Sequence, residues 1–412
     1  MSSTRSLRVR VFAATWLSYV GFYFCRKNFS VLMPILERDE RITSAQLADV
    51  LFVYSLCYLT GQFTSGLLSD RWGARRVVTG GMLVSAAVTA MLGWHHSFLA
   101  IVIAQGINGY AQACGWPGLL KMMAGAFDSR SRGVVMGWWT TNYVIGGFFA
   151  TVFATWAATG PLMVALGWER GAWWPAVALV VAAVTFYLLS RSFPQSGTER
   201  VHAFAGLREV LQNRAVNIIA GMYFVLKMAR YVFLFWLPLY MTQRLGYQPD
   251  EAGYTSSVFE IAGFVGAVLA GYVSDRLARG RRFPIGTSMM ILLAALFFIY
   301  PTLSPMGRGA NIIGIALIGM MLFGTDTLMT GAAVQDLVRT EVTATAGGYT
   351  NAVGSAGQLV SPFIASIISM RFGWAAVFYL LVGTTIVGAG VLATQWNHRR
   401  PGVPAPAPVT TV

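Results

Sequence analysis

Residues 66–71 read Gly-Leu-Leu-Ser-Asp-Arg, and residues 271–276 read Gly-Tyr-Val-Ser-Asp-Arg. The two hexapeptides lie 205 residues apart in a chain of 412, so they occupy equivalent places in its two halves. Four further matches keep nearly the same offset: Arg10 with Arg214, Arg26 with Arg230, Pro34 with Pro238, and Gly167-Trp168 with Gly373-Trp374. One match could arise by chance, whereas a set held at offsets of 204 to 206 residues indicates an internal repeat.

Nearly charge-free stretches recur along the whole chain, and each is about as long as the ~20 residues that an α-helix needs to cross a membrane. Hydrophobic residues make up 56% of the sequence and charged residues only 11%, against about a quarter in soluble domains. The expected fold is therefore all-α and integral to the membrane, with twelve transmembrane helices in two pseudo-symmetric six-helix bundles. The expected spans are 11–36, 46–68, 77–94, 98–124, 133–157, 173–190, 215–241, 251–273, 284–302, 310–335, 345–369 and 373–395.

The polar segment 191–214 is the longest break and separates an N-terminal bundle, 1–190, from a C-terminal bundle, 215–395. We expect this segment to be a cytoplasmic linker, and the Pro-, Val- and Thr-rich tail 396–412 to be disordered. Nineteen arginines lie in connectors on the side of the termini and six on the opposite side. This positive-inside asymmetry predicts cytoplasmic termini, in what we expect to be a bacterial inner membrane. It also accounts for the net charge of +14 without nucleic acid as a partner.

Two arginines stand deep inside the spans at equivalent positions of the repeat. Arg26 and Arg230 each follow a cytoplasmic arginine by 16 residues, or about 24 Å at ~1.5 Å per residue. That depth exceeds the reach of a snorkelling side chain, and a central arginine costs about 2.5–3.5 kcal/mol. Because two halves in the same orientation place a substrate site at their interface, we expect both arginines to face one central cavity.

A pair of guanidinium groups predicts a small anionic substrate, since the planar fork binds phosphate or carboxylate through two parallel hydrogen bonds. The alternative is that each arginine pairs permanently with an acid, and Glu260 and Asp326 are the deeply placed acids. Lys27 lies about 100° round the helix from Arg26. We therefore assign Lys27 to an ion pair with Glu260, and Asp326 to the counter-charge in the second half.

Several other side chains are expected near the arginines or at the gates. Lys227 precedes Arg230 by three residues and shares its face. Tyr23 belongs to a stripe with Tyr19, Arg26 and Ser30, and Tyr143 is either a cavity residue or a packing residue. The repeated loops are expected to hold the cytoplasmic face shut, because an aspartate can cap a helix end and pair with arginine. Their gating residues are Asp70, Arg71, Asp275 and Arg276.

These features resemble the major facilitator superfamily, whose signature loop between the second and third helices is similar to both Gly-x-x-Ser-Asp-Arg motifs. Within it, three stretches look like the organophosphate:phosphate antiporter family: Phe24-Cys25-Arg26-Lys27-Asn28-Phe29 with Met33-Pro34, Asn108-Gly109 with Gln112 and Gly115-Trp116-Pro117, and Arg230-Tyr231 with Trp236 and Pro238. The resemblance covers the whole chain. It implies that Arg26 and Arg230 bind phosphate, with Lys27 and Glu260 in a neighbouring ion-pair network.

Two departures from that family concern the charge of the site. The family usually has Ser-Lys-Phe in the second span, where this chain has Gly61-Gln62-Phe63, and one branch has histidine where this chain has Tyr143. The resemblance therefore places Gln62 in the site with less positive charge around the ligand. A phosphonate that carries its own amino group would fit such a site.

The leading functional hypothesis is a secondary antiporter that exchanges an organophosphate or phosphonate for inorganic phosphate by alternating access. One alternative is a proton-coupled organic-anion symporter with Glu260 or Asp326 as the titrating group. The other is a membrane sensor of sugar phosphates that signals to a kinase. No G-x-x-x-x-G-K-[ST] motif and no nucleophile–base pair is evident, so neither ATP-driven transport nor an enzyme is expected. No cofactor or metal is expected, and the partners are a small anion and the bilayer, with the chain acting as a monomer.

Overall fold

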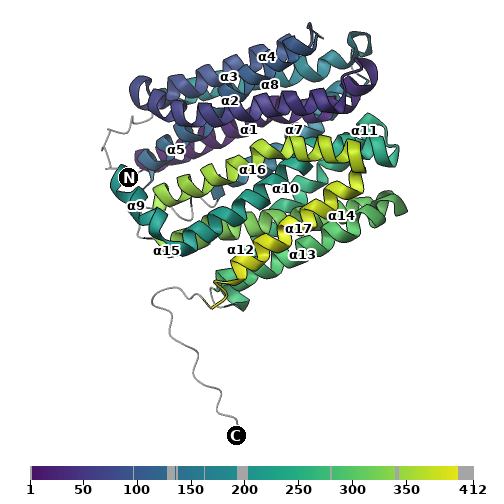
Figure 1. Ribbon diagram of the computed structural model, residues 1–412. Helices are drawn as coiled ribbons and strands as arrows, with labels where there is room; N and C mark the ends of the chain where they lie inside the picture. Colours follow the sequence, from purple (N-terminus) through teal and green to yellow (C-terminus); the bar gives the residue numbers. More distant parts are fainter. Residues whose placement is uncertain are drawn as a thin grey trace.

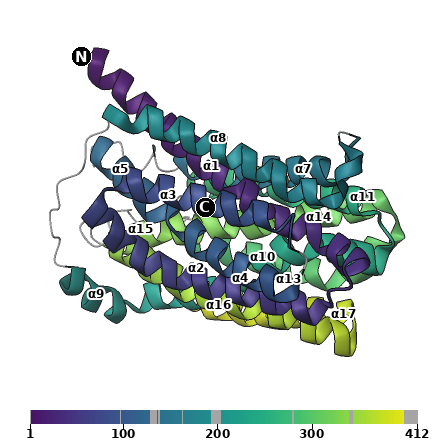
Figure 2. The same cartoon turned by 90° about the horizontal axis from the view of Figure 1, so that it is seen from above.

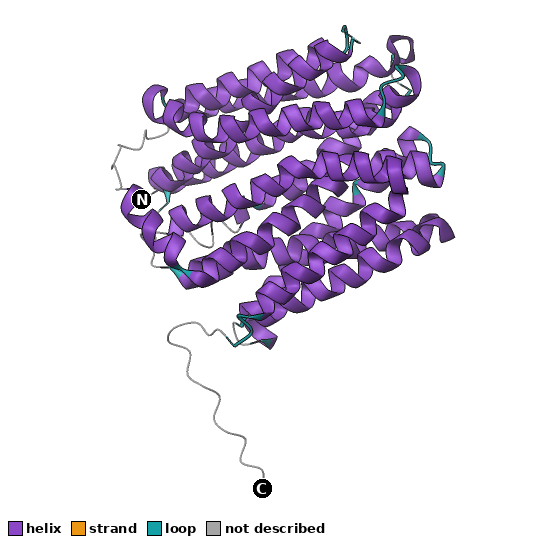
Figure 3. Ribbon diagram, in the orientation of Figure 1, coloured by secondary structure: helices purple, strands orange, loops and turns teal. Residues whose placement is uncertain are grey.

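The computed structural model describes residues 2–95, 97–127, 135, 138–161, 163–192, 203–278, 281–338 and 343–397. Within those residues the elements are helices joined by short connectors, as Figure 3 shows. Local chemistry fixes several helix starts: Thr43 and Gln46 form a reciprocal capping box, and Asn213 accepts from the backbone N–H groups of Ala215 and Val216. The fold is the all-α membrane architecture that the sequence predicts.

Each of the twelve expected spans has a helical counterpart in the structure. The first half contains α1 (Ser2–Asp39), α2 (Ser44–Trp72), α3 (Ala74–Met91), α4 (Phe98–Ala113), α5 (Gly115–Ala126), α7 (Thr141–Thr159) and α8 (Arg170–Leu189). The second half contains α10 (Arg214–Leu245), α11 (Pro249–Ser256), α12 (Val258–Tyr272), α13 (Arg282–Leu303), α14 (Arg308–Asp326), α15 (Val334–Leu337), α16 (Thr343–Phe372) and α17 (Trp374–Ala393). Seven helical stretches of the described residues are long and apolar enough to span a membrane by themselves.

Three expected spans are interrupted in the structure. The fourth divides into α4 and α5 at Cys114, close to Pro117, and the eighth divides into α11 and α12 at Ser257. The tenth contains a π-helical segment, η5 (Thr327–Ala333), which begins directly after Asp326. Proline explains the first break, because Pro117 has no N–H for the carbonyl of Ala113. The Ser65 hydroxyl donates to that carbonyl at 3.1 Å instead.

The two groups of helices lie side by side, with the N-terminal group at the top of Figure 1 and the C-terminal group below it. They meet where α1 packs on α10, α2 on α16, and α7 on α11 and α12. In the perpendicular view of Figure 2 the helices run lengthwise, and α5, α9 (Ala203–Gln212) and α15 lie toward one end. Large apolar side chains such as Phe298 and Val387 are exposed on the outside, where lipid would cover them.

The repeat is visible in matching contacts of the two halves. The Trp168 indole donates to the Glu40 carboxylate at 3.2 Å, and the Trp374 indole donates to the Gln243 side-chain oxygen at 2.9 Å. Each bond joins the last span of a half to the end of that half's first helix. At this same end, Gln243 also donates to the Glu37 carboxylate at 2.6 Å and so joins the two halves.

The expected linker 191–214 contains a helix, α9, that was not predicted from the sequence. Linker residues 193–202 lie outside the described part of the chain. The expected disordered tail, 396–412, also lies outside it from residue 398 onward.

Candidate functional site

Arg26 lies on α1, is 4% exposed, and contacts aromatic and amide groups. Its Nε donates to Gln112 Oε1 at 3.2 Å, and its Cζ lies 4.9 Å and 5.0 Å from the ring centroids of Tyr23 and Tyr58. Gln112 is held in turn, since its Nε2 donates to the Phe22 carbonyl and the Ser85 hydroxyl, both at 2.9 Å. Among the described residues, no carboxylate pairs with Arg26, and its buried Nη2 has no hydrogen-bond partner.

Arg230 lies on α10, is 9% exposed, and has an acidic partner. Its Nη1 lies 3.0 Å from Asp326 Oδ2, while Asp326 Oδ1 accepts from the Thr330 hydroxyl at 3.0 Å. Its Cζ lies 4.9 Å from the ring centroid of Tyr143 and 4.6 Å from that of Phe323. Tyr143 comes from α7 in the other half, so this site contains residues of both bundles. The alternative of a permanent acid pair fits the geometry at Arg230 and not that at Arg26.

The structure brings the two arginines into one electrostatic environment. The charges of both Arg26 and Arg230 act on the hydroxyl of Tyr23 and on the ammonium group of Lys227. Lys227 is 6% exposed, and its Nζ donates to Asn351 Oδ1 at 3.0 Å and to Ser355 Oγ at 2.9 Å. Three buried basic side chains therefore lie within electrostatic range of one another, with aromatic rings beside both arginines. A negative ligand is the group that such an arrangement accommodates with the least electrostatic cost.

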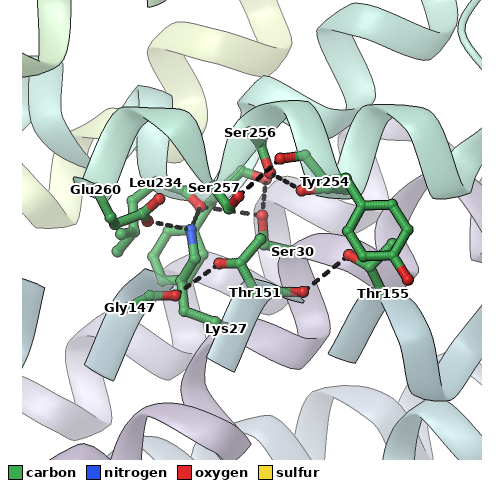
Figure 4. A network of polar contacts seen from close by, with 12 residues as sticks. Lys27, Ser30, Gly147, Thr151, Thr155, Leu234, Tyr254, Ser256, Ser257 and Glu260 are labelled. Carbon is green, nitrogen blue, oxygen red and sulfur yellow. Dashed lines mark hydrogen bonds and ion pairs between the residues drawn. The ribbon is translucent and has the colours of Figure 1, made fainter. Parts of the chain in front are cut away.

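Lys27 and Glu260 meet at the interface between the halves (Figure 4). Lys27 Nζ lies 2.8 Å from Glu260 Oε1, within ion-pair distance, and both side chains are 2% exposed. The directions are not those of a hydrogen bond, and neither carboxylate oxygen of Glu260 has a hydrogen-bond partner among the described residues. Gly147 makes room for this acid, because a Cβ at that position would stand 2.9 Å from Glu260 Cγ.

The second contact of Lys27 is a backbone carbonyl that a proline leaves without its helical donor. Pro238 has no N–H for the carbonyl of Leu234 in the preceding turn of α10. Lys27 Nζ donates to that carbonyl at 2.8 Å and the Ser30 hydroxyl donates to it at 3.0 Å, both from α1 (Figure 4). Ser30 also donates to the Phe235 carbonyl at 2.9 Å. The carbonyl that Pro238 leaves without a donor in one half is thus satisfied by donors from the other half.

The remaining expected residues lie on α2 and at the equivalent place in the second half. Gln62 is half-buried on α2, one helical turn beyond Tyr58. Arg71 and Arg276 are exposed at the ends of α2 and of η3 (Val273–Leu277), and the side chains of Asp70 and Asp275 lie outside the described part of the structure. The gating contacts expected of these loops therefore stay a prediction.

Several neighbours of the expected site were not predicted as such from the sequence. Gln112, Tyr58 and Phe323 contact the arginines, and Asn351 and Ser355 hold Lys227. A usable signal existed, because Asn351 and Ser355, like Asn108 and Gln112, are polar pairs four residues apart inside apolar spans. Polar side chains in such segments generally face other helices or a cavity.

Comparisons with known proteins identify a superfamily that matches the fold and, within it, several relatives with named substrates. Residues 15–359 match the family model described as Major Facilitator Superfamily. The "Glycerol-3-phosphate transporter" of Bacillus subtilis (strain 168) is 28% identical, over 95% of this chain and 93% of its own length. A "Probable hexose phosphate transport protein" of Chlamydia trachomatis serovar D is 25% identical, over 95% of this chain and 91% of its own length.

Solved structures share the fold at low sequence identity. A nucleoside transporter, NupG, superposes with a TM-score of 0.73 at 14% identity, covering 94% of this chain and 99% of its own. A bacterial homologue of the human lysosomal transporter Spinster, in an inward-facing and unoccupied conformation, has a TM-score of 0.71 at 15% identity, covering 95% and 96%. Both likenesses concern the arrangement of helices alone.

Proposed function

The chain belongs to the major facilitator superfamily, as a membrane transporter and not an enzyme, and from this premise we propose that it carries an organophosphate or phosphonate across the membrane in exchange for inorganic phosphate. The observation that carries the proposal is Arg26, a buried guanidinium without a carboxylate partner among the described residues. Curated relatives named as glycerol-3-phosphate and hexose phosphate transporters support the class of substrate.

The geometry supports a phosphoryl group held between the two arginines. Aromatic rings lie near both guanidinium groups, so the N–H edges remain the natural contacts for an anion. Around the site, the four cations Arg26, Lys27, Lys227 and Arg230 face two carboxylates, Glu260 and Asp326. This excess of positive charge suits a phosphate monoester, which carries about −1.5 to −2 at neutral pH.

Exchange follows from the same excess of charge. Closing the two halves around unbalanced positive charges in a low-dielectric environment has a high free-energy cost. An anion that bridges Arg26 of one half and Arg230 of the other removes this cost and favours movement of the halves around it. Reorientation is then fast only when an anion is bound, which makes transport an exchange of one anion for another.

Proton-coupled symport is the second candidate function, and Glu260 is the observation in its favour. Its buried carboxylate oxygens accept no hydrogen bond from the described residues and depend on Lys27 for compensation. Protonation of such a group would release Lys27. A proton gradient would then drive uptake of the anion without any counter-anion inside.

We also propose the placement of the chain in its membrane. The bundles 1–190 and 215–395, the linker 191–214 and both termini follow the arginine asymmetry, with the linker and termini in the cytoplasm of a bacterial cell. We expect a monomer to be sufficient, since both arginines come from one chain. Labelling of Ser196→Cys by a membrane-impermeant reagent applied outside intact cells would contradict this topology.

Counterflow in proteoliposomes tests the function directly. Vesicles loaded with phosphate are diluted into labelled phosphate esters, phosphonates or carboxylates, with and without a pH gradient. Uptake that requires internal phosphate and is indifferent to the pH gradient supports antiport. Uptake into phosphate-free vesicles that follows the pH gradient supports the symporter instead. Saturable ligand binding without transport of any of these anions would indicate a sensor and refute the proposal.

A further inference from the structure

An apolar groove of about 540 Å³ runs along the outside of the N-terminal bundle, away from the arginines. It is formed by α1, α7 and α8, and small residues create its floor. Gly21 is the closest point, because a Cβ there would stand 2.7 Å from Ala182 Cβ. Leu17, Phe149 and Val181 line the groove and are 49%, 54% and 60% exposed, so it opens to the surroundings of the bundle.

The length of the groove matches one leaflet of a bilayer. On α1 it extends from Ala14 to Phe24, which is about 15 Å at ~1.5 Å per residue. The hydrocarbon core of a bilayer is about 30 Å thick, so the groove covers half of it. A single acyl chain of one leaflet is the apolar group with this length and orientation.

Positive charge stands at one end of the groove. Arg10 lies one helical turn before Ala14 on the same face of α1, and its Nη2 donates to the Leu189 carbonyl at 3.4 Å. Leu189 follows Phe186 by three residues and continues the groove face of α8. Arg10 is exposed, as is Arg191 just beyond α8. The end of the groove is therefore cationic, where the headgroup of a lipid in the groove would lie.

We propose that this groove binds an anionic phospholipid, with an acyl chain between α1 and α8 and the phosphate at Arg10. In the topology proposed above, Arg10 faces the cytoplasmic leaflet, where anionic lipids attract basic residues near the surface. The bound lipid would steady the packing of α1, which carries Arg26, against α8. Charge complementarity favours this occupant over a second copy of the chain, whose matching groove would bring Arg10 to Arg10.

Two variants separate the contributions of the acyl chain and of the headgroup to lipid binding. Ala178→Phe fills the groove while keeping Arg10, and Arg10→Gln removes the charge while keeping the groove. Val180→Phe, on an exposed part of α8 that does not line the groove, and Arg76→Gln, at an exposed arginine of α3, are matched controls. Native mass spectrometry of the full chain, from vesicles of phosphatidylcholine with and without phosphatidylglycerol, counts retained lipids, and thermal unfolding measures stabilisation.

The expected result is selective retention of phosphatidylglycerol by the unmodified chain and both controls. Arg10→Gln should weaken retention about five-fold, and Ala178→Phe should abolish it. Equal retention of both lipids by the unmodified chain, or unchanged selectivity in both groove variants, would overturn the proposal. So would a loss of dimers in Ala178→Phe without any change in bound lipid, because the groove would then be an interface between copies.

Discussion

Residues 26–34 of α1 and 230–238 of α10 share the same spacing of arginine and proline but differ in the groups that their side chains contact. Each begins with a buried arginine and ends with a proline eight residues later. Arg26 has an amide and two tyrosine rings as neighbours, whereas Arg230 has the carboxylate of Asp326. Lys27 and Ser30 of the first segment are hydrogen-bond donors. Their repeat equivalents are Tyr231 and Leu234, and the Leu234 carbonyl accepts a hydrogen bond from both Lys27 and Ser30.

The two halves therefore repeat the geometry of this segment but not the partners of its arginine. The half with α1 presents an arginine whose charge is not neutralised by a described acid, together with two donors toward its partner. The half with α10 presents a neutralised arginine and the Leu234 carbonyl, which accepts from both of those donors. We infer that Arg26 is the stronger anion anchor and that Arg230 responds when the anion arrives, because Asp326 competes with the ligand for it.

Replacing either arginine by lysine is expected to have the largest effect. Arg26→Lys and Arg230→Lys keep the charge and lose the planar fork. Each should abolish detectable binding, a loss of more than about 100-fold from two charge-assisted hydrogen bonds of about 1.5–3 kcal/mol each. Isothermal titration with phosphate measures this.

A buried arginine outside the site gives the control for that experiment. Arg170 is 5% exposed and donates to the Ala158 carbonyl, so Arg170→Lys should bind phosphate normally. Near-normal binding in Arg26→Lys or Arg230→Lys would remove that arginine from the site and break the comparison.

Asp326→Asn removes the acidic partner of Arg230, so that neither arginine is paired with a described carboxylate. Its main effect is expected on the stability of the folded protein. It leaves Arg230 buried without a charged partner, which should lower the free energy of unfolding by about 3–5 kcal/mol. Added phosphate should recover part of this loss, because the anion replaces the carboxylate. Thermal unfolding with and without phosphate is the measurement.

The matched variant is Asp336→Asn. Its carboxylate pairs with Arg282 at 3.2 Å, and both side chains are 13–15% exposed. That pair should matter less, and phosphate should not compensate for its loss. An equal rescue of both variants by phosphate would mean that the anion stabilises the protein away from Arg230.

The fold and the buried charged residues of the candidate site could be predicted from the sequence, because they depend on span length, repeat offset and depth in the membrane, whereas the role of these residues in binding stays a prediction. Arg26, Arg230, Lys27, Glu260 and Asp326 were found in this way. The assignment of Lys27 to Glu260 and of Asp326 to the second half agrees with the two ion pairs. The uncharged partners of Arg26 could not be predicted, since they depend on how the helices pack. Gln112 and Ser30 were missed as partners for the same reason: helical spacing gives a residue's face but not the group opposite it.

Gln62→Lys adds a cation to the N-terminal half. The organophosphate:phosphate antiporter family, which this chain resembles, usually has a lysine at this position. Gln62 lies one turn from Tyr58, whose ring contacts Arg26. A new cation there should shift preference from aminophosphonates toward doubly charged phosphate esters by about 1–3 kcal/mol, or roughly 5- to 150-fold. Competition binding with paired ligands measures the ratio. An unchanged ratio in a folded variant would show that Gln62 is a packing residue.

The smallest effect is expected where the two segments touch. Ser30→Ala removes the hydroxyl that donates to the carbonyls of Leu234 and Phe235, which should weaken contact between the halves by about 0.5–1.5 kcal/mol and speed local opening about 2- to 10-fold. Hydrogen exchange of the α1 residues 30–39 reports that opening. Ser65→Ala is the matched control, because its hydroxyl donates to the Ala113 carbonyl that Pro117 leaves free, but within one half. If both variants speed exchange equally, the bond from Ser30 contributes no more to joining the halves than an ordinary bond inside a bundle. If only Ser30→Ala does so, the hydroxyl of Ser30 makes a specific contact that holds the two halves together.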